Sequence, residues 1–524
     1  MNLKPIEIFA EYQKGTQFKA AIGTRGLFEQ SKINARFFVG DQWYGANCGT
    51  DKPLVRHNVI KRIGDYKMSQ ILNDKTAIGF SAEGIPTAEV TAPTEFSGPL
   101  SDTEISAVMT ALDGYYSVTC ERINFPSLSA SVLKNAYISG TALLYTYWNP
   151  VLSTGTFADS KGTQPIKGDI SCEILRIEDV VFGDPYCEEL QNQPYVIISA
   201  KKNVANVVRE ARLYGADLST LTLIEESAID GKVEVLTRLY KTINKDGSIT
   251  VKGIKATSNA IVRSEFSTGL RLYPLAQLKW ETMNFSAYGE SEITYLIPNQ
   301  IAINRLITAN VWSEMSTGLP IMLVNGDTVN EKITNDPGQI VKIYGSNEDV
   351  AGAVKYVTPP SYIKEFDDSI NTLINNTLTQ SGANEVALGD SKADNATALI
   401  TMRDAALMPL NIVKNRYYVF LEDVARIWAD FWITHYGKRS LKLKNGNEIT
   451  YIPFDGERYK KLIINAKIDV IRDTVYTEKE QLDTLLTLFD KGIITKAELL
   501  DRIPKGLVAN SGSISREEKE NDRL

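Results

Sequence analysis

The stretch from Gly289 to Met315 carries the pattern that most constrains the fold. Its apolar residues recur at helical spacing and form one broad stripe: Ile293, Leu296, Ile297, Ile303, Leu306, Ile307 and Val311. Ser291 stands where a helix cap is expected, and Pro298 lies within the first turns, where we expect a break or a kink. Periodicity alone favours an ordinary core helix, so any functional meaning has to come from the segments around it.

A small strand-like insert and a second helix follow this stretch. The insert covers residues 317–360 and contains three runs that are typical of strands: 319–324, 340–344 and 354–357. A short helix is expected from about Tyr362 to Thr379. Residues 381–395 are rich in Gly, Asn, Asp and Ser, which predicts a loop.

A long helix is expected next, from Asn395 or Ala396 through Arg403 and Trp428. It contains Pro409 in its interior, so we expect a kink there. The remaining chain predicts strands at 441–444, 448–453 and 463–471, helices at 477–489 and 495–503, and a polar tail from 510 that we expect to be disordered.

The first half of the chain changes character near residue 140. Residues 1–140 predict mainly helices, with Asn58 and Asp102 opening two of them and Gly140 ending a third. From 141 to about 280, short runs rich in β-branched and aromatic residues mix with helical ones. A hairpin is predicted there, with strands at 233–243 and 249–262 and a turn at 244–247. The fold class is therefore α+β, predominantly helical.

Length and charge bound the possible functions. A chain of 524 residues exceeds one core of about 250–300 residues, so at least two packed regions are expected. A net charge of -7 argues against tight binding of nucleic acid, which needs clustered Lys and Arg. Four irregularly spaced cysteines predict no disulfide framework, and nothing predicts a signal peptide or a membrane-spanning helix.

The residues needed for common catalytic sites are scarce. Only two histidines occur, His57 and His435, and each is expected to be a surface or packing residue. Neither a GxGxxG fingerprint nor a Walker A loop is present. Adjacent carboxylates such as Asp367 and Asp368, or those at 225 and 226, are typical of solvated faces. We therefore expect no enzyme activity, no cofactor and no metal.

Several segments resemble the portal proteins of tailed bacteriophages, particularly phages of Gram-positive hosts. The matching stretches occur in family order along almost the whole chain: NARFFVGDQW at 34–43, GESEI at 289–293, LIPNQIAIN at 296–304, ALGD at 387–390, NATAL at 395–399 and VYTE at 475–478. The family implies a closed ring, in most members a dodecamer, with wing, stem, clip and crown regions around an axial channel.

The resemblance divides the chain into regions. Residues 1–289 are the first part of the wing, 290–316 the first stem helix, 317–360 the clip, 361–380 the second stem helix, 381–395 the tunnel loop, 396–475 the rest of the wing, and 476–524 the crown and C-terminal tail. The family function is to pass double-stranded DNA into the capsid and later out of it, without reading its sequence. The expected location is the portal vertex of the virion, after assembly in the host cytoplasm.

The resemblance also implies partners and contact residues. The terminase large subunit and a head-tail adaptor dock on the clip, and the major capsid and scaffolding proteins surround the ring. The clip residues expected to serve this docking are Lys332, Asp336, Lys342, Glu348 and Asp349. The tunnel-loop residues expected to face the channel are Gly382, Ala383, Asn384, Glu385, Val386, Ala387, Leu388, Gly389, Asp390 and Lys392.

The charge of this loop agrees with a channel that DNA slides through. Glu385, Asp390 and Asp394 outnumber Lys392, so the loop offers few phosphate-binding groups. The alternative interpretation is an ordinary surface loop. For the whole chain, the alternatives are another phage structural protein, such as a capsid or tail component, or a phage hydrolase or nuclease.

Overall fold

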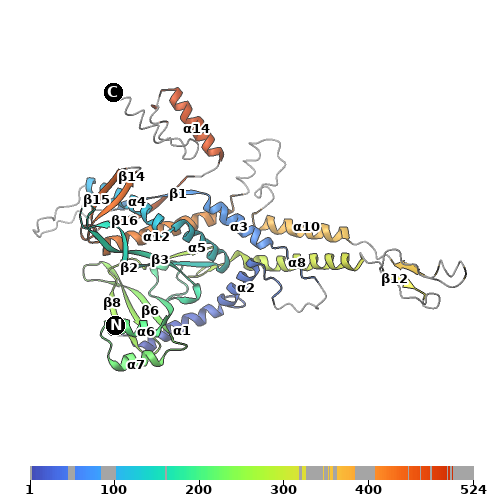
Figure 1. The fold of residues 1–524 in the computed structure, drawn as a ribbon, viewed down its shortest axis with the longest axis horizontal. Coiled ribbons are helices and arrows are strands. Elements are labelled where there is room, and N and C mark those ends of the chain that lie inside the picture. Colours follow the sequence, from blue (N-terminus) through green and yellow to red (C-terminus); the bar gives the residue numbers. More distant parts are fainter. Residues whose placement is uncertain are drawn as a thin grey trace, which may run out of the picture.

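The computed structural model describes residues 3–44, 53–83, 102–159, 162–317, 321–325, 346, 352, 354–357, 363–383, 407–445, 448–460, 462–471, 475–492, 494–495 and 499. These residues form both helices and antiparallel sheets, which confirms the α+β class. A broad body occupies one end of the molecule, and two helices project from it side by side (Figure 1).

The helices and strands have the following bounds. The helices are α1 (Pro5–Ala21), α2 (Leu27–Val39), α3 (Val59–Leu72), α4 (Asp102–Ile123), α5 (Phe125–Ser139), α6 (Val204–Leu213), α7 (Leu218–Glu226), α8 (Glu292–Thr317), α10 (Ile363–Gln380), α12 (Leu410–His435), α13 (Gly456–Tyr459) and α14 (Val475–Asp490), with short 3-10 turns η1 (Ile177–Asp179) and η2 (Leu190–Asn192). The strands are β1 (Lys75–Glu83), β2 (Thr141–Phe157), β3 (Pro165–Leu175), β4 (Val180–Phe182), β5 (Val196–Asn203), β6 (Lys232–Ile243), β7 (Ile249–Ala256), β8 (Ile261–Ser267), β9 (Leu275–Lys279), β10 (Glu281–Thr282), β11 (Gly289–Glu290), β12 (Ile321–Val324), β13 (Val354–Val357), β14 (Lys438–Asn445), β15 (Glu448–Asp455) and β16 (Ile463–Ile471).

The predicted helix ends in the first 140 residues are confirmed. The Asn58 side chain accepts a hydrogen bond from the Lys61 N–H at 3.0 Å and so caps α3. Helix α4 begins at Asp102, and Gly140 ends α5 at a φ of +80°. A Cβ on Gly140 would lie 2.5 Å from the Gly289 carbonyl oxygen, so both the backbone angle and the close approach require glycine.

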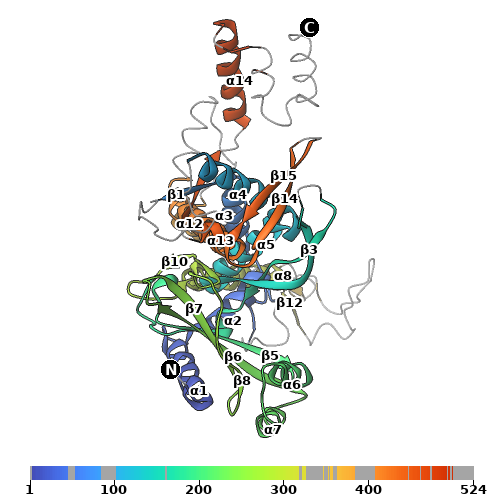
Figure 2. The ribbon, with the colours of Figure 1, turned by 90° about the vertical axis from the view of Figure 1, so that its left-hand side faces the viewer.

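Strands β4 to β8 form a five-stranded antiparallel sheet that is covered on both faces. Helices α6 and α7 pack on one face and α1 on the other (Figure 2). The predicted β6–β7 hairpin is confirmed, with Ile243 paired to Ile249 at its turn. The predicted single strand from 249 to 262 is wrong, because a turn in which the Thr257 N–H donates to the Ala260 carbonyl at 2.8 Å divides it into β7 and β8.

Two further sheets bring together segments that are far apart in the sequence. One has the strand order β15-β14-β2-β3, with β9 also paired to β2, and the other pairs β1 with β16. The strands expected near 441–444, 448–453 and 463–471 are therefore confirmed as β14, β15 and β16. Strand β1 was not expected, because its segment lies within a region that otherwise predicts helices.

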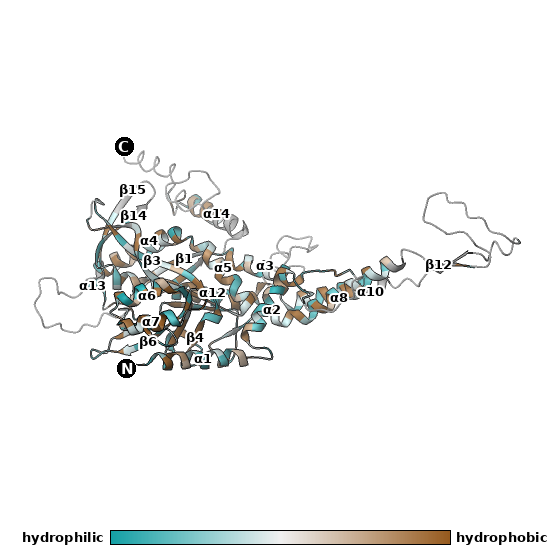
Figure 3. Ribbon diagram, turned by 60° about the horizontal axis from the view of Figure 1, so that its bottom comes forward, coloured by the Kyte–Doolittle hydropathy of each residue, from teal (hydrophilic) through white to brown (hydrophobic). Residues whose placement is uncertain are grey.

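Helix α12 runs through the main core. Its side chains Phe420, Trp428 and Trp432 are fully buried, and Figure 3 shows the hydrophobic residues concentrated in the body around it. Pro409 does not lie inside a continuous helix. Leu407 is helical, Met408 and Pro409 form a turn, and α12 begins at Leu410 with Pro409 as its N-cap, so the helix is interrupted at the place where the sequence predicts a kink. Proline has no N–H to donate and blocks the preceding turn, so it is better placed at a helix start. Residues 395–406 of the predicted helix lie outside the described part of the chain.

Helix α8 is continuous from Glu292 to Thr317, although it contains Pro298. Of the two predicted outcomes at Pro298, a break or a kink, the continuous helix excludes the break. Pro298 withholds one N–H from the carbonyl of Thr294, but the buried side chains of Ile293 and Leu296 anchor the first turns in the core and hold them helical. The expected second helix is confirmed as α10, within one residue at each end.

Candidate functional site

Helices α8 and α10 form a projection that carries the antiparallel strand pair β12–β13 beyond its outer end (Figure 1). They run antiparallel, and side-chain bonds join them at two levels. Near the body, Asn299 Nδ2 donates to Thr377 Oγ1 at 3.3 Å; further out, Asn310 Nδ2 donates to Asp367 Oδ1 at 2.9 Å. These bonds fix the rotation of each helix about its own axis.

The seam between the two helices is part apolar and part polar. Ile303 on α8 and Ile370 and Leu378 on α10 are buried. Asn310 is also buried, and its Oδ1 atom has no hydrogen-bond partner within the described residues. Asp367, predicted to lie on a solvated face, is exposed but also accepts the bond from Asn310.

The base of α8 is tied to the body by its first residues. The Ser291 Oγ accepts from the Ile293 N–H at 3.2 Å, which confirms the predicted cap, and donates to the Tyr137 carbonyl at 2.5 Å. The buried Glu292 carboxylate accepts from Lys67 Nζ at 2.6 Å and from Trp280 Nε1 at 3.2 Å. A buried charge needs such partners, so this end of α8 is firmly held.

Only the antiparallel strand pair β12–β13 of the predicted clip is described in any detail. Ile321 pairs with Val357, and Val324 with Val354, which confirms two of the three expected strand runs. The run at 340–344 lies outside the described residues. The same is true of all five predicted docking residues: Lys332, Asp336, Lys342, Glu348 and Asp349.

The predicted tunnel loop is described only at its first residues. Gly382 has a φ of +75° and ends α10, with its N–H donating to the Thr379 carbonyl and the Ala383 N–H donating to the Leu378 carbonyl, both at 3.0 Å. This arrangement is a Schellman motif. Gly382 is therefore a helix terminator. The Ala383 side chain is fully buried in the main core, so it packs there rather than lining a channel.

The other residues predicted for that loop lie outside the described part of the chain: Asn384, Glu385, Val386, Ala387, Leu388, Gly389, Asp390 and Lys392.

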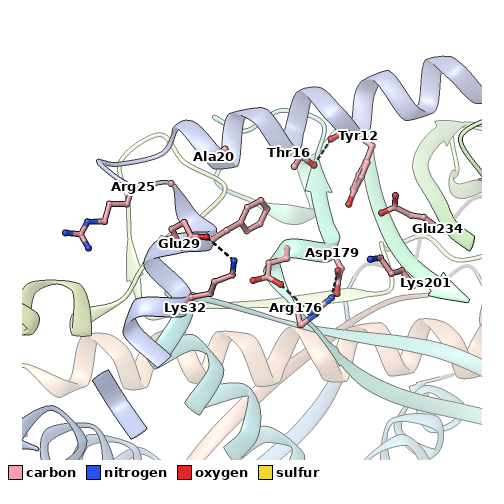
Figure 4. A pocket seen from close by; sticks show the side chains of 13 residues that line it. Tyr12, Thr16, Ala20, Arg25, Glu29, Lys32, Arg176, Asp179, Lys201 and Glu234 are labelled. Carbon is pink, nitrogen blue, oxygen red and sulfur yellow. Dashed lines mark hydrogen bonds and ion pairs between the residues drawn. The ribbon is translucent and has the colours of Figure 1, made fainter. Parts of the chain in front are cut away.

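An open hollow of about 420 Å³ lies between α1, α2, η1 and strands β5 and β6 (Figure 4). The Arg176 guanidinium makes two 2.9 Å bonds to Asp179, and Lys32 Nζ lies 2.9 Å from Glu29 Oε1. The lining of the hollow contains equal numbers of basic and acidic side chains. The basic ones are Arg25, Lys32, Arg176 and Lys201, and the acidic ones are Glu29, Glu178, Asp179 and Glu234. No His or Cys is among the residues that line the hollow.

A buried ammonium group lies beside this hollow. Lys19 is fully buried, and its Nζ donates to the carbonyls of Ile177, Glu178 and Val180 at 2.9, 2.8 and 2.9 Å. Burial lowers the pKa of Lys19 to about 7, although Asp179 and Glu178 oppose the shift. The three carbonyls take the place of water and attach the end of α1 to η1 and β4.

The two histidines and the cysteines Cys120 and Cys172 differ in their surroundings. The His57 side chain is exposed, and His435 stacks on Trp148 with ring centroids 4.9 Å apart. Cys120 and Cys172 are partly buried, and burial raises the pKa of both thiols, to about 12 and about 11. These thiols are therefore protonated near neutral pH.

Two features are absent from the described ranges. Among those residues, no group of His, Cys, Asp and Glu side chains is arranged to hold a metal ion. In the same part of the chain, no helix combines the length and the apolar character needed to cross a membrane.

Sequence reasoning missed three polar residues of α8 that face the body: Gln300, Asn304 and Thr308. They bond to the segment that leads into α3. Their spacing of four residues within an otherwise apolar helix was the signal that could have revealed them.

No protein-family model matches the chain. No curated protein matches it either.

Proposed function

We propose that this chain is a portal subunit of a tailed bacteriophage, one copy in a ring through which double-stranded DNA enters and leaves the capsid. One observation carries the proposal: two long antiparallel helices project from an α+β body and have a pair of antiparallel strands, β12 and β13, inserted between them (Figure 1). This is the order of stem, clip and stem that the resemblance implies for residues 290–380.

The surface of the projection supports an assembly of several copies. Two helices alone cannot cover all of each other's apolar residues. Leu306, Ile307 and Val311 on α8 are only partly buried, and Tyr295 and Met315 are 57% and 56% exposed. Neighbouring copies placed around an axis would cover these side chains, since a head-to-tail interface that closes produces a ring.

The partners follow from the same proposal. The clip, residues 317–360, is where the terminase large subunit and then a head-tail adaptor bind, and the body meets the major capsid and scaffolding proteins. Because Gly382 ends α10 and Ala383 is buried, the part of the predicted tunnel loop that faces DNA is 384–395. It does not read the DNA sequence, and its acids Glu385 and Asp390 offer no phosphate-binding charge. The protein then belongs to the portal vertex of the virion.

Electron microscopy of the purified full chain tests the ring directly. We expect closed rings with a central hole, together with one dominant high-mass species in native mass spectrometry. A monomer at all protein and salt concentrations would refute the proposal. Replacing residues 325–353 by a short Gly-Ser linker should keep the ring and abolish binding of terminase and adaptor in a pull-down. Retained binding by such rings would refute the clip assignment.

A further inference from the structure

Three side chains of α8 hold an extended segment of the body in register. The backbone N–H groups of alternate residues in this segment point at α8. The Val55 N–H donates to Thr308 Oγ1 at 3.2 Å, the His57 N–H to Asn304 Oδ1 at 3.1 Å, and the Val59 N–H to Gln300 Oε1 at 2.9 Å: these three bonds are the rungs of what we call the α8 ladder.

The spacing of the rungs is a property of the two backbones. Two residues of extended chain advance about 6.6 Å. Four residues of α-helix advance about 6 Å. Acceptors at 300, 304 and 308 therefore match donors at 59, 57 and 55 with little strain, and the segment runs antiparallel to α8.

Additional bonds fix the two amide side chains of the ladder. Gln300 Nε2 donates to the His57 carbonyl at 2.6 Å and to Asn304 Oδ1 at 3.0 Å. Asn304 Nδ2 donates to Gln42 Oε1 at 2.6 Å, and Gln300 Oε1 also accepts from the Ile60 N–H at 3.3 Å. Gln300 and Asn304 are 1% and 2% exposed, so water does not replace these bonds.

Gln300 also completes the start of α3. The first N–H groups of a helix have no partner within it. Here Gln300 accepts from Val59 and Ile60, and Asn58 accepts from Lys61. The first turn of α3 is therefore capped in part by a side chain that belongs to α8.

The sequence of α8 permits only one register of the ladder. One turn before Gln300 stands Leu296, and one turn after Thr308 stands Trp312. Neither side chain has a strong acceptor for a backbone N–H. A slip of α8 by one turn in one direction would place Trp312 against the Val55 N–H, which would lose its acceptor. A slip in the other direction would place Leu296 against the Val59 N–H, which would keep only its 2.9 Å bond to the His57 carbonyl.

We infer that Gln300, Asn304 and Thr308 are positioning residues that lock residues 55–60 to α8, so that the base of α8 and the first turn of α3 move as one unit. The lock itself does not depend on what the protein does. Its consequence for DNA passage, that any displacement of the projection reaches the body through α3, rests on the proposed function.

Hydrogen exchange of single backbone amides in the full chain tests the outermost rung. Thr308→Val keeps the shape of the side chain but removes the acceptor, so the Val55 amide should exchange about 2- to 10-fold faster. Thr308→Ser retains the hydroxyl and should restore slow exchange. Thr372→Val, on the exposed face of α10, is the matched control, since Thr372 bonds only to the Asp368 carbonyl of its own helix. Equal Val55 exchange in wild type and Thr308→Val would overturn the inference.

Gln300→Met tests whether the rungs act together. If the ladder is one unit, the exchange rate rises at the Val55 and His57 amides as well as at those of Val59 and Ile60. Gln300 accepts hydrogen bonds only from the Val59 and Ile60 N–H groups, so the rise at Val55 and His57 would be indirect. Faster exchange confined to Val59 and Ile60 would show independent bonds and overturn the claim of a single unit. Failure of the wild-type chain to form rings would count against the portal proposal alone, because the exchange results stand without it.

Discussion

Replacing Asp169 by Asn should destabilise the body strongly, because this carboxylate is a buried charge on which three elements converge. Asp169 is fully buried on β3. Its Oδ2 accepts from the Tyr115 hydroxyl at 2.8 Å and lies 3.2 Å from Arg122 Nη2, and its Oδ1 accepts from the Tyr436 hydroxyl at 2.7 Å. Burial raises the pKa of both tyrosines, and the negative charge of Asp169 adds to the rise, so they remain protonated donors.

The expected loss follows from these contacts. Breaking a buried ion pair by removing one partner costs about 3–5 kcal/mol of the free energy of unfolding. Arg122 retains some exposure, with 22% of its side chain accessible, and it also donates to the Ile170 carbonyl. We therefore expect the lower end, about 3 kcal/mol for Asp169→Asn.

Equilibrium unfolding in urea measures this loss through the shift of the midpoint at constant slope. Asp65→Asn, at an exposed position of α3, is the control and should change the free energy of unfolding by less than about 0.5 kcal/mol. A double-mutant cycle of Asp169→Asn with Tyr436→Phe should give a coupling of about 1 kcal/mol or more. If Asp169→Asn unfolds at the same urea concentration as the control, the carboxylate does not hold these elements together.

Three more predictions concern pH, backbone conformation and the channel. Burial lowers the pKa of His435 below its usual value despite the opposing charge of Asp430, so the unfolded chain takes up a proton first as the pH falls below about 6.5. The free energy of unfolding should therefore decrease as the pH falls further. Melting temperatures compared across pH should show a smaller decrease in His435→Phe. Gly140→Ala forces a side chain into a positive φ and toward the Gly289 carbonyl, so it should cost more than about 1 kcal/mol in urea unfolding, and a neutral result would contradict the reasoning. In heads built with Glu385→Lys and Asp390→Lys together, intact rings should package less DNA, with a defect that weakens as salt rises; normal packaging would show that this loop does not meet DNA.

Local sequence patterns were sufficient for the elements of the projection. The apolar stripe of α8, the cap at Ser291 and the extent of α10 depend on contacts between residues three or four apart, which the sequence displays directly. The β6–β7 hairpin depends on a short turn and an alternating pattern, and it was predicted for the same reason.

Predictions from local sequence patterns were wrong where two patterns compete, or where a strand pairs with a segment far away in the sequence. Pro298 and Pro409 carry the same chemical signal, yet α8 continues through the first while α12 starts after the second. The difference lies in the packing around each residue, since the buried Ile293 and Leu296 secure the turns that Pro298 weakens. Strand β1 was missed because its partner β16 lies near the other end of the chain.

The α8 ladder and the Asp169 contacts were decided by tertiary structure alone. From the sequence, Gln300, Asn304 and Thr308 are three polar residues in an apolar helix, and nothing nearby names Val55, His57 and Val59 as their donors. Such pairings depend on how far one helix slides along a distant segment. The hydrophobic stripe sets which face of α8 is buried, because apolar contacts are non-directional. The position of α8 along its axis is set only by the packed body, because hydrogen bonds require particular distances and angles.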